Sequence, residues 1–196
     1  MQPKTVLFAC AVVSITAGLA SRSATAQSGA QAPAVSIARH TNLWQNVWPG
    51  DFNGDGITDL FLYRSTGDWY RVLFTTDGVV YEAGAWSPGW NISRGDFNDD
   101  GRADLFVYNQ STGRWFVMIT ESNGAMTAYG GVTWASGFQV TITDINADGK
   151  ADLLLYNPTD GRWFQCITVT PGQFTFYTGN FGAGWTSVIA SRTILP

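Results

Sequence analysis

Short apolar runs alternate with turns rich in Gly, Asn and Asp along most of this chain. The clearest run, Leu60–Tyr63, returns as Leu105–Tyr108 and as Leu153–Tyr156. Runs of this length, bounded by turn residues and rich in aromatic and β-branched side chains, are typical of β-strands. No stretch beyond the first residues has a helical period. The pattern therefore predicts an all-β fold.

The same order of turns and strands follows each of these runs. A turn leads into a third strand that begins at a tryptophan, and we expect these strands at 69–74, 115–120 and 163–168. We expect a fourth strand that ends in Tyr81, Tyr129 and Tyr177, and then an aromatic linking turn with Trp86 and Trp90, Trp134 and Phe138, or Phe181 and Trp185. A strand that enters the next unit completes each period.

The units recur at intervals of 45 and 48 residues, from Asp51 to Asp96 and from there to Asp144. Four short antiparallel strands per unit correspond to one blade of a β-propeller. Because the aromatic residues recur in register, we expect most of them to pack between blades. We expect a repeat domain over 43–196, with blades at about 43–88, 89–136 and 137–183 and an extra C-terminal strand at 184–195.

Three blades are fewer than the about 4–8 that closed propellers usually have. The chain is expected to form an open arc, or to close a ring together with further chains, which makes a homo-oligomer the expected state. A shortened descendant of a longer repeat protein is the third alternative. An open arc would expose apolar faces and strand edges, which favours association.

A nine-residue acidic loop precedes each of the three apolar runs. Positions 1, 3 and 5 are Asp, Asn and Asp in every copy, position 6 is Gly and position 9 is Asp. Position 7 varies, as expected if only its backbone carbonyl binds. The predicted metal ligands are Asp51, Asn53, Asp55, Ile57 and Asp59; Asp96, Asn98, Asp100, Arg102 and Asp104; and Asp144, Asn146, Asp148, Lys150 and Asp152, with Ile57, Arg102 and Lys150 binding through the carbonyl.

Clustered oxygen ligands favour Ca²⁺, which accepts about 6–8 oxygens in flexible geometry, over the stricter Mg²⁺. The loops lack sulfur and imidazole, which disfavours zinc and copper. We expect about three calcium ions per chain. An EF-hand is excluded because position 12 holds Leu62, Val107 or Leu155 where Glu is required. The alternative is a hairpin turn held by Asx hydrogen bonds.

The Asp-x-Asn-x-Asp-Gly-x-x-Asp loop in a β repeat of this length resembles the FG-GAP/VCBS repeats of integrin-α-like propellers. The resemblance covers about residues 43–194, and the aromatic linking turns are similar to those of bacterial and fungal propeller lectins. It implies calcium binding in the hairpin between the first two strands of each blade. It also implies a role in adhesion, ligand binding or sugar recognition. The chain departs from the family in having too few blades for a ring of its own.

The N-terminus has the features of an export signal. Residues 1–26 combine Lys4, an apolar stretch and a small-residue cleavage site at 24–26, and residues 27–42 read as a flexible lead-in. We therefore expect a secreted protein, extracellular or periplasmic, with no membrane span after the signal is removed. The mature chain would carry 15 acidic and 9 basic residues, a balance of −6, and ten of the acids lie in the three loops. No basic cluster suggests a nucleic-acid partner.

Catalysis is not expected. The chain has one histidine, His40, so neither a Ser-His-Asp arrangement nor a Cys-His pair with Cys166 is indicated. Five ligands per loop would leave few open positions for a metal-dependent hydrolase. We expect a non-catalytic calcium-binding module for adhesion or binding, with carbohydrate or a surface protein as candidate ligand and Trp86, Trp90 and Trp134 as candidate contacts. The alternative is a structural assembly protein whose calcium-stiffened blades oligomerise or complete a partner's propeller.

Overall fold

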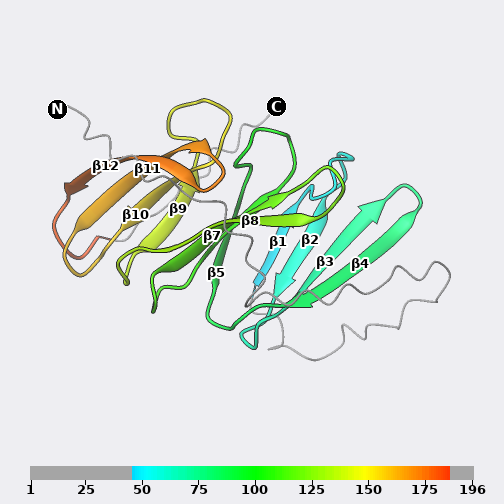
Figure 1. The fold of residues 1–196 in the computed structure, drawn as a ribbon, viewed down its shortest axis with the longest axis horizontal. Coiled ribbons are helices and arrows are strands. Elements are labelled where there is room, and N and C mark those ends of the chain that lie inside the picture. Colours follow the sequence, from blue (N-terminus) through cyan, green and yellow to red (C-terminus); the bar gives the residue numbers. More distant parts are fainter. Residues whose placement is uncertain (1–45, 186–196) are drawn as a thin grey trace.

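The computed structural model describes residues 46–185, and these residues form three four-stranded antiparallel sheets. Each sheet is built from consecutive strands, and the sheets stand side by side in chain order (Figure 1). Sheet 1 contains β1 (Asn46–Gly50), β2 (Asp59–Tyr63), β3 (Asp68–Thr75) and β4 (Gly78–Ala85). Sheet 2 contains β5 (Asn91–Gly95), β6 (Asp104–Tyr108), β7 (Arg114–Thr120) and β8 (Met126–Thr133). Sheet 3 contains β9 (Gln139–Thr143), β10 (Asp152–Tyr156), β11 (Arg162–Thr170) and β12 (Gln173–Asn180).

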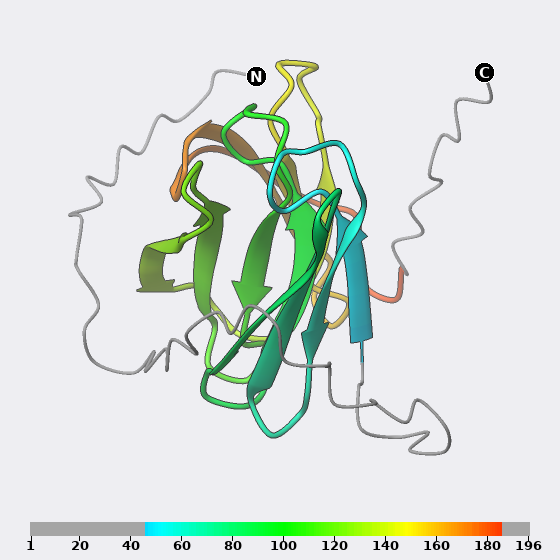
Figure 2. The same ribbon diagram turned by 90° about the vertical axis from the view of Figure 1, so that its right-hand side faces the viewer.

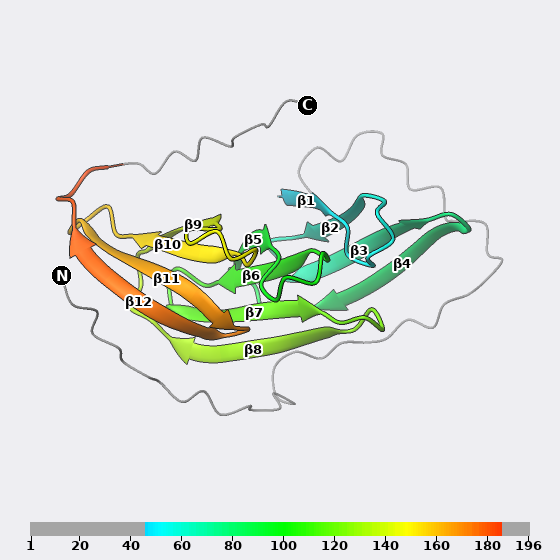
Figure 3. The ribbon, with the colours of Figure 1, turned by 90° about the horizontal axis from the view of Figure 1, so that it is seen from above.

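This architecture confirms the predicted all-β fold of blade-like sheets, and the described residues do not close into a ring. The first strands β1, β5 and β9 are neighbours, and the last strands β4, β8 and β12 lie on the outside of the arc (Figure 3). Among the described residues, no helix could cross a membrane. The expected export signal, the lead-in and nearly all of the extra C-terminal strand lie outside the described residues.

Two apolar cores hold the sheets together, one in each gap between neighbours. In the first core, Phe61 and Trp86 of the sheet 1 side face Leu105 and Met118 of sheet 2. The second core repeats this arrangement between sheets 2 and 3. Because successive side chains of a strand point to opposite faces, sheet 2 contributes to both cores and all five residues of β6 are buried.

The fourth strand of each sheet is longer than expected. The prediction that it ends at Tyr81, Tyr129 and Tyr177 is wrong, since β4, β8 and β12 continue to Ala85, Thr133 and Asn180. Glycines within these extensions lie against the tryptophan that is the second residue of the third strand. A Cβ at Gly84 or Gly179 would lie 2.4 or 2.5 Å from the indole of Trp69 or Trp163. These glycines therefore allow close packing inside a strand, where the sequence suggested a turn.

Candidate functional site

The three acidic loops lie at the same end of the sheets, each joining the first two strands of its sheet (Figure 2). A backbone hydrogen bond links each loop to the next: Ala103 N donates to Asp51 O at 2.6 Å, and Ala151 N donates to Asp96 O at 2.6 Å. The loops therefore form a continuous row across the molecule.

Position 1 of each loop organises the turn. In the first loop, Gly54 N and Gly56 N donate to the two carboxylate oxygens of Asp51 at 2.6 and 2.8 Å. Gly56 has a φ of 82°, and a Cβ at this position would have no neighbour within 4 Å, so its backbone conformation, and not crowding, requires glycine. The Asx-turn hydrogen bonds that were the alternative to metal binding are thus present. They do not exclude a cation, because a carboxylate oxygen has two lone pairs.

Position 9 of each loop is buried. Asp59, Asp104 and Asp152 are 0% exposed. Both oxygens of Asp104 accept backbone hydrogen bonds, from Phe97 N at 2.9 Å and from Thr120 N at 2.8 Å. Asp59 and Asp152 have the same pattern. These carboxylates therefore tie the start of each loop to the third strand of its own sheet, a role that the sequence did not indicate.

The carboxylates within a loop influence one another. Burial raises the pKa of Asp104 to about 7, and the negative charges of Asp96 and Asp100 add to the rise, although two backbone donors oppose it. Burial also raises the pKa of Asp59, with smaller contributions from Asp55 and Asp51. The loops thus concentrate negative charge that a cation would stabilise.

Position 7 supplies a cation of its own in two loops. The guanidinium of Arg102 pairs with Asp100, and Lys150 Nζ lies 2.8 Å from Asp148 Oδ2. The hydrogen bond from Lys150 lowers the pKa of Asp148 to about 2. Ile57 holds this position in the first loop, so Asp55 has no such partner within its loop. The variation that suggested a carbonyl ligand therefore also changes the charge of each loop.

The oxygen donors of the loops fit Ca²⁺ in kind. In the second loop, Asn98 Oδ1 is buried and has no hydrogen-bond donor among the described residues, so its lone pairs are available to a cation. Within residues 46–185, however, no three side chains of His, Cys, Asp or Glu are placed together as a metal-binding group.

The aromatic residues expected to contact a ligand pack largely within the molecule. Trp86 is buried and stacks on Phe61, with ring centroids 5.6 Å apart. Trp134 is half-buried and lies 4.6 Å from Trp115 by ring centroids, and half-buried Trp90 packs on Phe116. Core packing therefore accounts for these three tryptophans better than ligand contact does.

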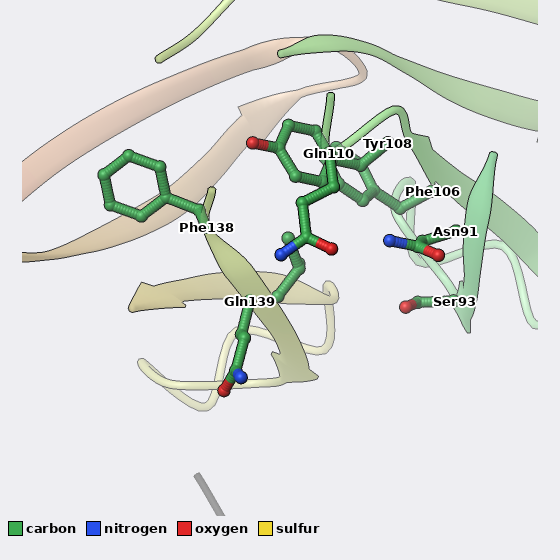
Figure 4. A pocket seen from close by; sticks show the side chains of 8 residues that line it. Asn91, Ser93, Phe106, Tyr108, Gln110, Phe138 and Gln139 are labelled. Atoms are coloured by element: carbon green, nitrogen blue, oxygen red, sulfur yellow. The ribbon is translucent and has the colours of Figure 1, made fainter. Parts of the chain in front are cut away.

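A hollow of about 230 Å³ opens between sheets 2 and 3 instead. Its apolar walls are Phe106, Tyr108 and Phe138, and a shallower depression beside it shares Asn91 and Gln110. Figure 4 shows the polar ends of Asn91, Ser93 and Gln110 facing the same space. The complete lining is Asn91, Ser93, Phe106, Tyr108, Gln110, Phe138, Gln139 and Val140, and it contains no charged side chain.

Two differences between sheets 1 and 2 explain why the hollow lies between sheets 2 and 3. Ser93 pairs with Phe106 as Trp48 pairs with Phe61, so Ser93 and Trp48 hold equivalent positions in sheets 2 and 1. The Trp48 ring packs 6.3 Å from that of Phe61, whereas Ser93 leaves this space open. Gln110 lies in a turn that is one residue longer than its counterpart in sheet 1. Comparison of the repeats shows both differences, but we did not predict a site from them.

The tyrosine that ends the second strand positions the linking turn beside the hollow. Tyr108 Oη donates to Ala135 O at 3.0 Å, and Tyr63 and Tyr156 make the equivalent bonds to Ser87 O and Gly182 O at 3.1 and 2.9 Å. The pKa of Tyr108 is raised by burial, which keeps the phenol protonated and able to donate.

Residues 96–155 match the family model of the FG-GAP-like repeat. This segment runs from the second acidic loop to the strand after the third loop, and the match confirms the resemblance inferred from the loops for this part of the chain. The comparison with curated proteins found no match. The three four-stranded sheets are consistent with propeller-like blades, and the FG-GAP-like repeat within them suggests a binding or adhesion module.

Proposed function

We propose that this protein is a secreted, non-catalytic module that binds a neutral carbohydrate in the hollow between sheets 2 and 3. The observation that carries the proposal is the lining of this hollow. Amide and hydroxyl groups of Asn91, Ser93 and Gln110 face this space, the rings of Phe106, Tyr108 and Phe138 behind them are only 1–2% exposed, and the lining has no charged side chain. Uncharged groups that both donate and accept hydrogen bonds suit a neutral ligand that carries many hydroxyl groups.

Carbohydrate binding can be tested on a glycan array, followed by calorimetry with the best sugar. Ser93→Trp should reduce affinity more than about 100-fold, because the side chain would fill the hollow as Trp48 fills its equivalent. Gln110→Ala should cost about tenfold, the value of one hydrogen bond of about 1–1.5 kcal/mol. Ser122→Trp is the matched control, since Ser122 is exposed in the turn between β7 and β8.

The array and the variant together decide the proposal. If the wild-type protein binds no sugar, carbohydrate is not the ligand. If Ser93→Trp binds the same sugar with unchanged affinity, the hollow is not the site.

We further propose that Ca²⁺ stabilises the acidic loops. Residues at positions 1, 3, 5 and 9 and the carbonyl of position 7 would hold the ion, whose charge would offset the clustered carboxylates. The unpartnered Asn98 Oδ1 and the mutual influence of the loop carboxylates support this proposal. Asp55 has no cationic side chain within its own loop, which makes the first loop the strongest candidate, since Arg102 and Lys150 compete with an ion in the other two.

Differential scanning calorimetry tests the calcium proposal. Millimolar Ca²⁺ should raise the melting temperature above that in excess EGTA, because an ion that binds only the folded state stabilises it by mass action. Asp55→Ala, Asp100→Ala and Asp148→Ala should each remove one binding event in calorimetric titration and leave the others. Identical melting with Ca²⁺ and with EGTA would contradict the proposal.

A separate observation favours the alternative that the protein assembles with further copies: apolar side chains are exposed on the outer faces of sheets 1 and 3. Because the hollow lies between sheets 2 and 3 and not on an outer face, the two functions can coexist.

A further inference from the structure

The two gaps between sheets are closed by the same joint. At one edge of each gap, the loop hydrogen bond described above joins the backbones at 2.6 Å. A linking-turn aromatic also packs edge-on against the third strand of the following sheet. Trp90 meets Phe116 with centroids 5.6 Å apart at 66°, and Phe138 meets Phe164 at 5.5 Å and 69°. The joint is therefore a repeated structural unit with two complementary halves.

The outer face of sheet 1 presents one half of this joint. Val47, Tyr70, Val79 and Tyr81 lie on it and are 39–50% exposed. By strand register they correspond to Ile92, Phe116, Met126 and Ala128, which pack against sheet 1 from sheet 2. The strand positions that make this contact inside the molecule thus carry apolar or aromatic side chains on the outer face of sheet 1 as well.

The outer face of sheet 3 presents the other half. Tyr177, Phe181 and Trp185 are 42–64% exposed. Phe181 holds the position of Trp86 and Trp134, and Trp185 holds that of Trp90 and Phe138. Phe181 stacks on Trp163 at 5.1 Å, so the aromatic surface is already ordered.

We infer that a second copy of this chain covers these faces head to tail, with sheet 3 of one copy against sheet 1 of the other. The exposed Tyr177, Phe181 and Trp185 of one copy then face the exposed apolar side chains of sheet 1 in the next. Two copies joined at both ends contain six sheets, which lies within the range of about 4–8 blades of closed propellers. A head-to-tail contact of this kind closes when its rotation brings the ends together.

The joint between copies differs from the internal joints at the loop edge. Inside the molecule, a Cβ at Gly50 would lie only 2.7 Å from Ala103 Cβ, so the close approach requires glycine opposite alanine. At the two ends of the row, Thr143 of sheet 3 holds the position of Gly50, and Thr58 of the first loop holds the position of Ala103. Two threonines cannot meet at that distance, so the joint between copies is more open there. Association is therefore weaker than the internal packing and reversible.

Sedimentation equilibrium of the purified protein tests the inference, with a mass of two copies expected at high concentration. Val79→Asp should weaken association at least about tenfold, because it would bury an unpaired charge in the contact. Val132→Asp is the matched control: Val132 is 50% exposed in β8 of sheet 2, outside both end faces, and the variant should associate like wild type. The double variant Thr58→Ala, Thr143→Gly restores the internal pattern and should tighten association at least about tenfold.

Each result bears on the inference. A wild-type protein that stays monomeric at high concentration overturns the inference. This holds even if the double variant associates, because the two threonines would then be blocking the contact in the natural chain. Association that Val79→Asp leaves unchanged places the contact elsewhere. The inference is independent of the carbohydrate proposal, because the hollow lies between sheets 2 and 3 and Val79→Asp should bind sugar normally.

Discussion

At the scale of single residues, the last aspartate of each acidic loop is both a predicted metal ligand and an acceptor of backbone hydrogen bonds. Its carboxylate lies at the end of a predicted metal loop, and it also receives two backbone donors that fix that loop to the third strand. The loop chemistry could be predicted because it repeats in the sequence. The burial of Asp104 could not, since it depends on Thr120 of a strand whose register only the folded sheet defines.

The raised pKa of Asp104 predicts a pH dependence of stability. Its folded pKa of about 7 exceeds the ordinary value of 3.8, so the folded state binds this proton more tightly than the unfolded state. The free energy of unfolding should therefore fall as pH rises from about 4 to about 7. Urea unfolding in EGTA at a series of pH values measures this slope.

Asp104→Asn should flatten the slope that Asp104 contributes, because the amide does not titrate. The variant should also be less stable at pH 4 by about 1–3 kcal/mol, since its NH₂ faces a backbone donor that has lost its acceptor. Asp99→Asn serves as the control, because Asp99 is exposed in the same loop. An unchanged slope in Asp104→Asn would show that other groups determine the pH dependence.

At the scale of elements, the second and third strands of each sheet followed from the sequence because apolar runs and tryptophans recur in register. The end of the fourth strand did not, because Gly84 and Gly179 resemble turn residues when only the sequence is considered. Their function is packing, which requires knowledge of the strand pairs Trp69–Gly84 and Trp163–Gly179. The near-constant separation of these pairs, 15 and 16 residues, is the signal that could have revealed the contact.

The hollow illustrates the same limit for the candidate site. Aromatic linking turns are prominent in the sequence, which is why it favours Trp86, Trp90 and Trp134 as ligand contacts. Aromatic residues that recur in every repeat serve the feature that every repeat needs, which is packing against the next sheet. The hollow lies instead where sheet 2 differs from sheet 1, with Ser93 in the place of Trp48 and with a longer turn at Gln110.

At the scale of the whole molecule, stability is distributed along the row of sheets. Sheet 2 packs on both neighbours, whereas sheets 1 and 3 each have one covered face. In such linear arrays, each unit is stabilised by its own structure and by its contacts with nearest neighbours. The middle sheet should therefore open least often, and a second copy should stabilise the two outer sheets specifically.

Hydrogen exchange followed by mass spectrometry tests this distribution. In the Val79→Asp variant, amides of β6 and β7 should exchange at least about tenfold more slowly than those of β2, β3, β10 and β11, because about 1.4 kcal/mol of extra opening free energy slows exchange tenfold. In the wild-type protein at high concentration, the outer sheets should become more protected and the difference should shrink. Val132→Asp should behave like wild type. Equal protection of all three sheets in the Val79→Asp variant would mean that the row unfolds as one cooperative unit, and the nearest-neighbour description would then be wrong.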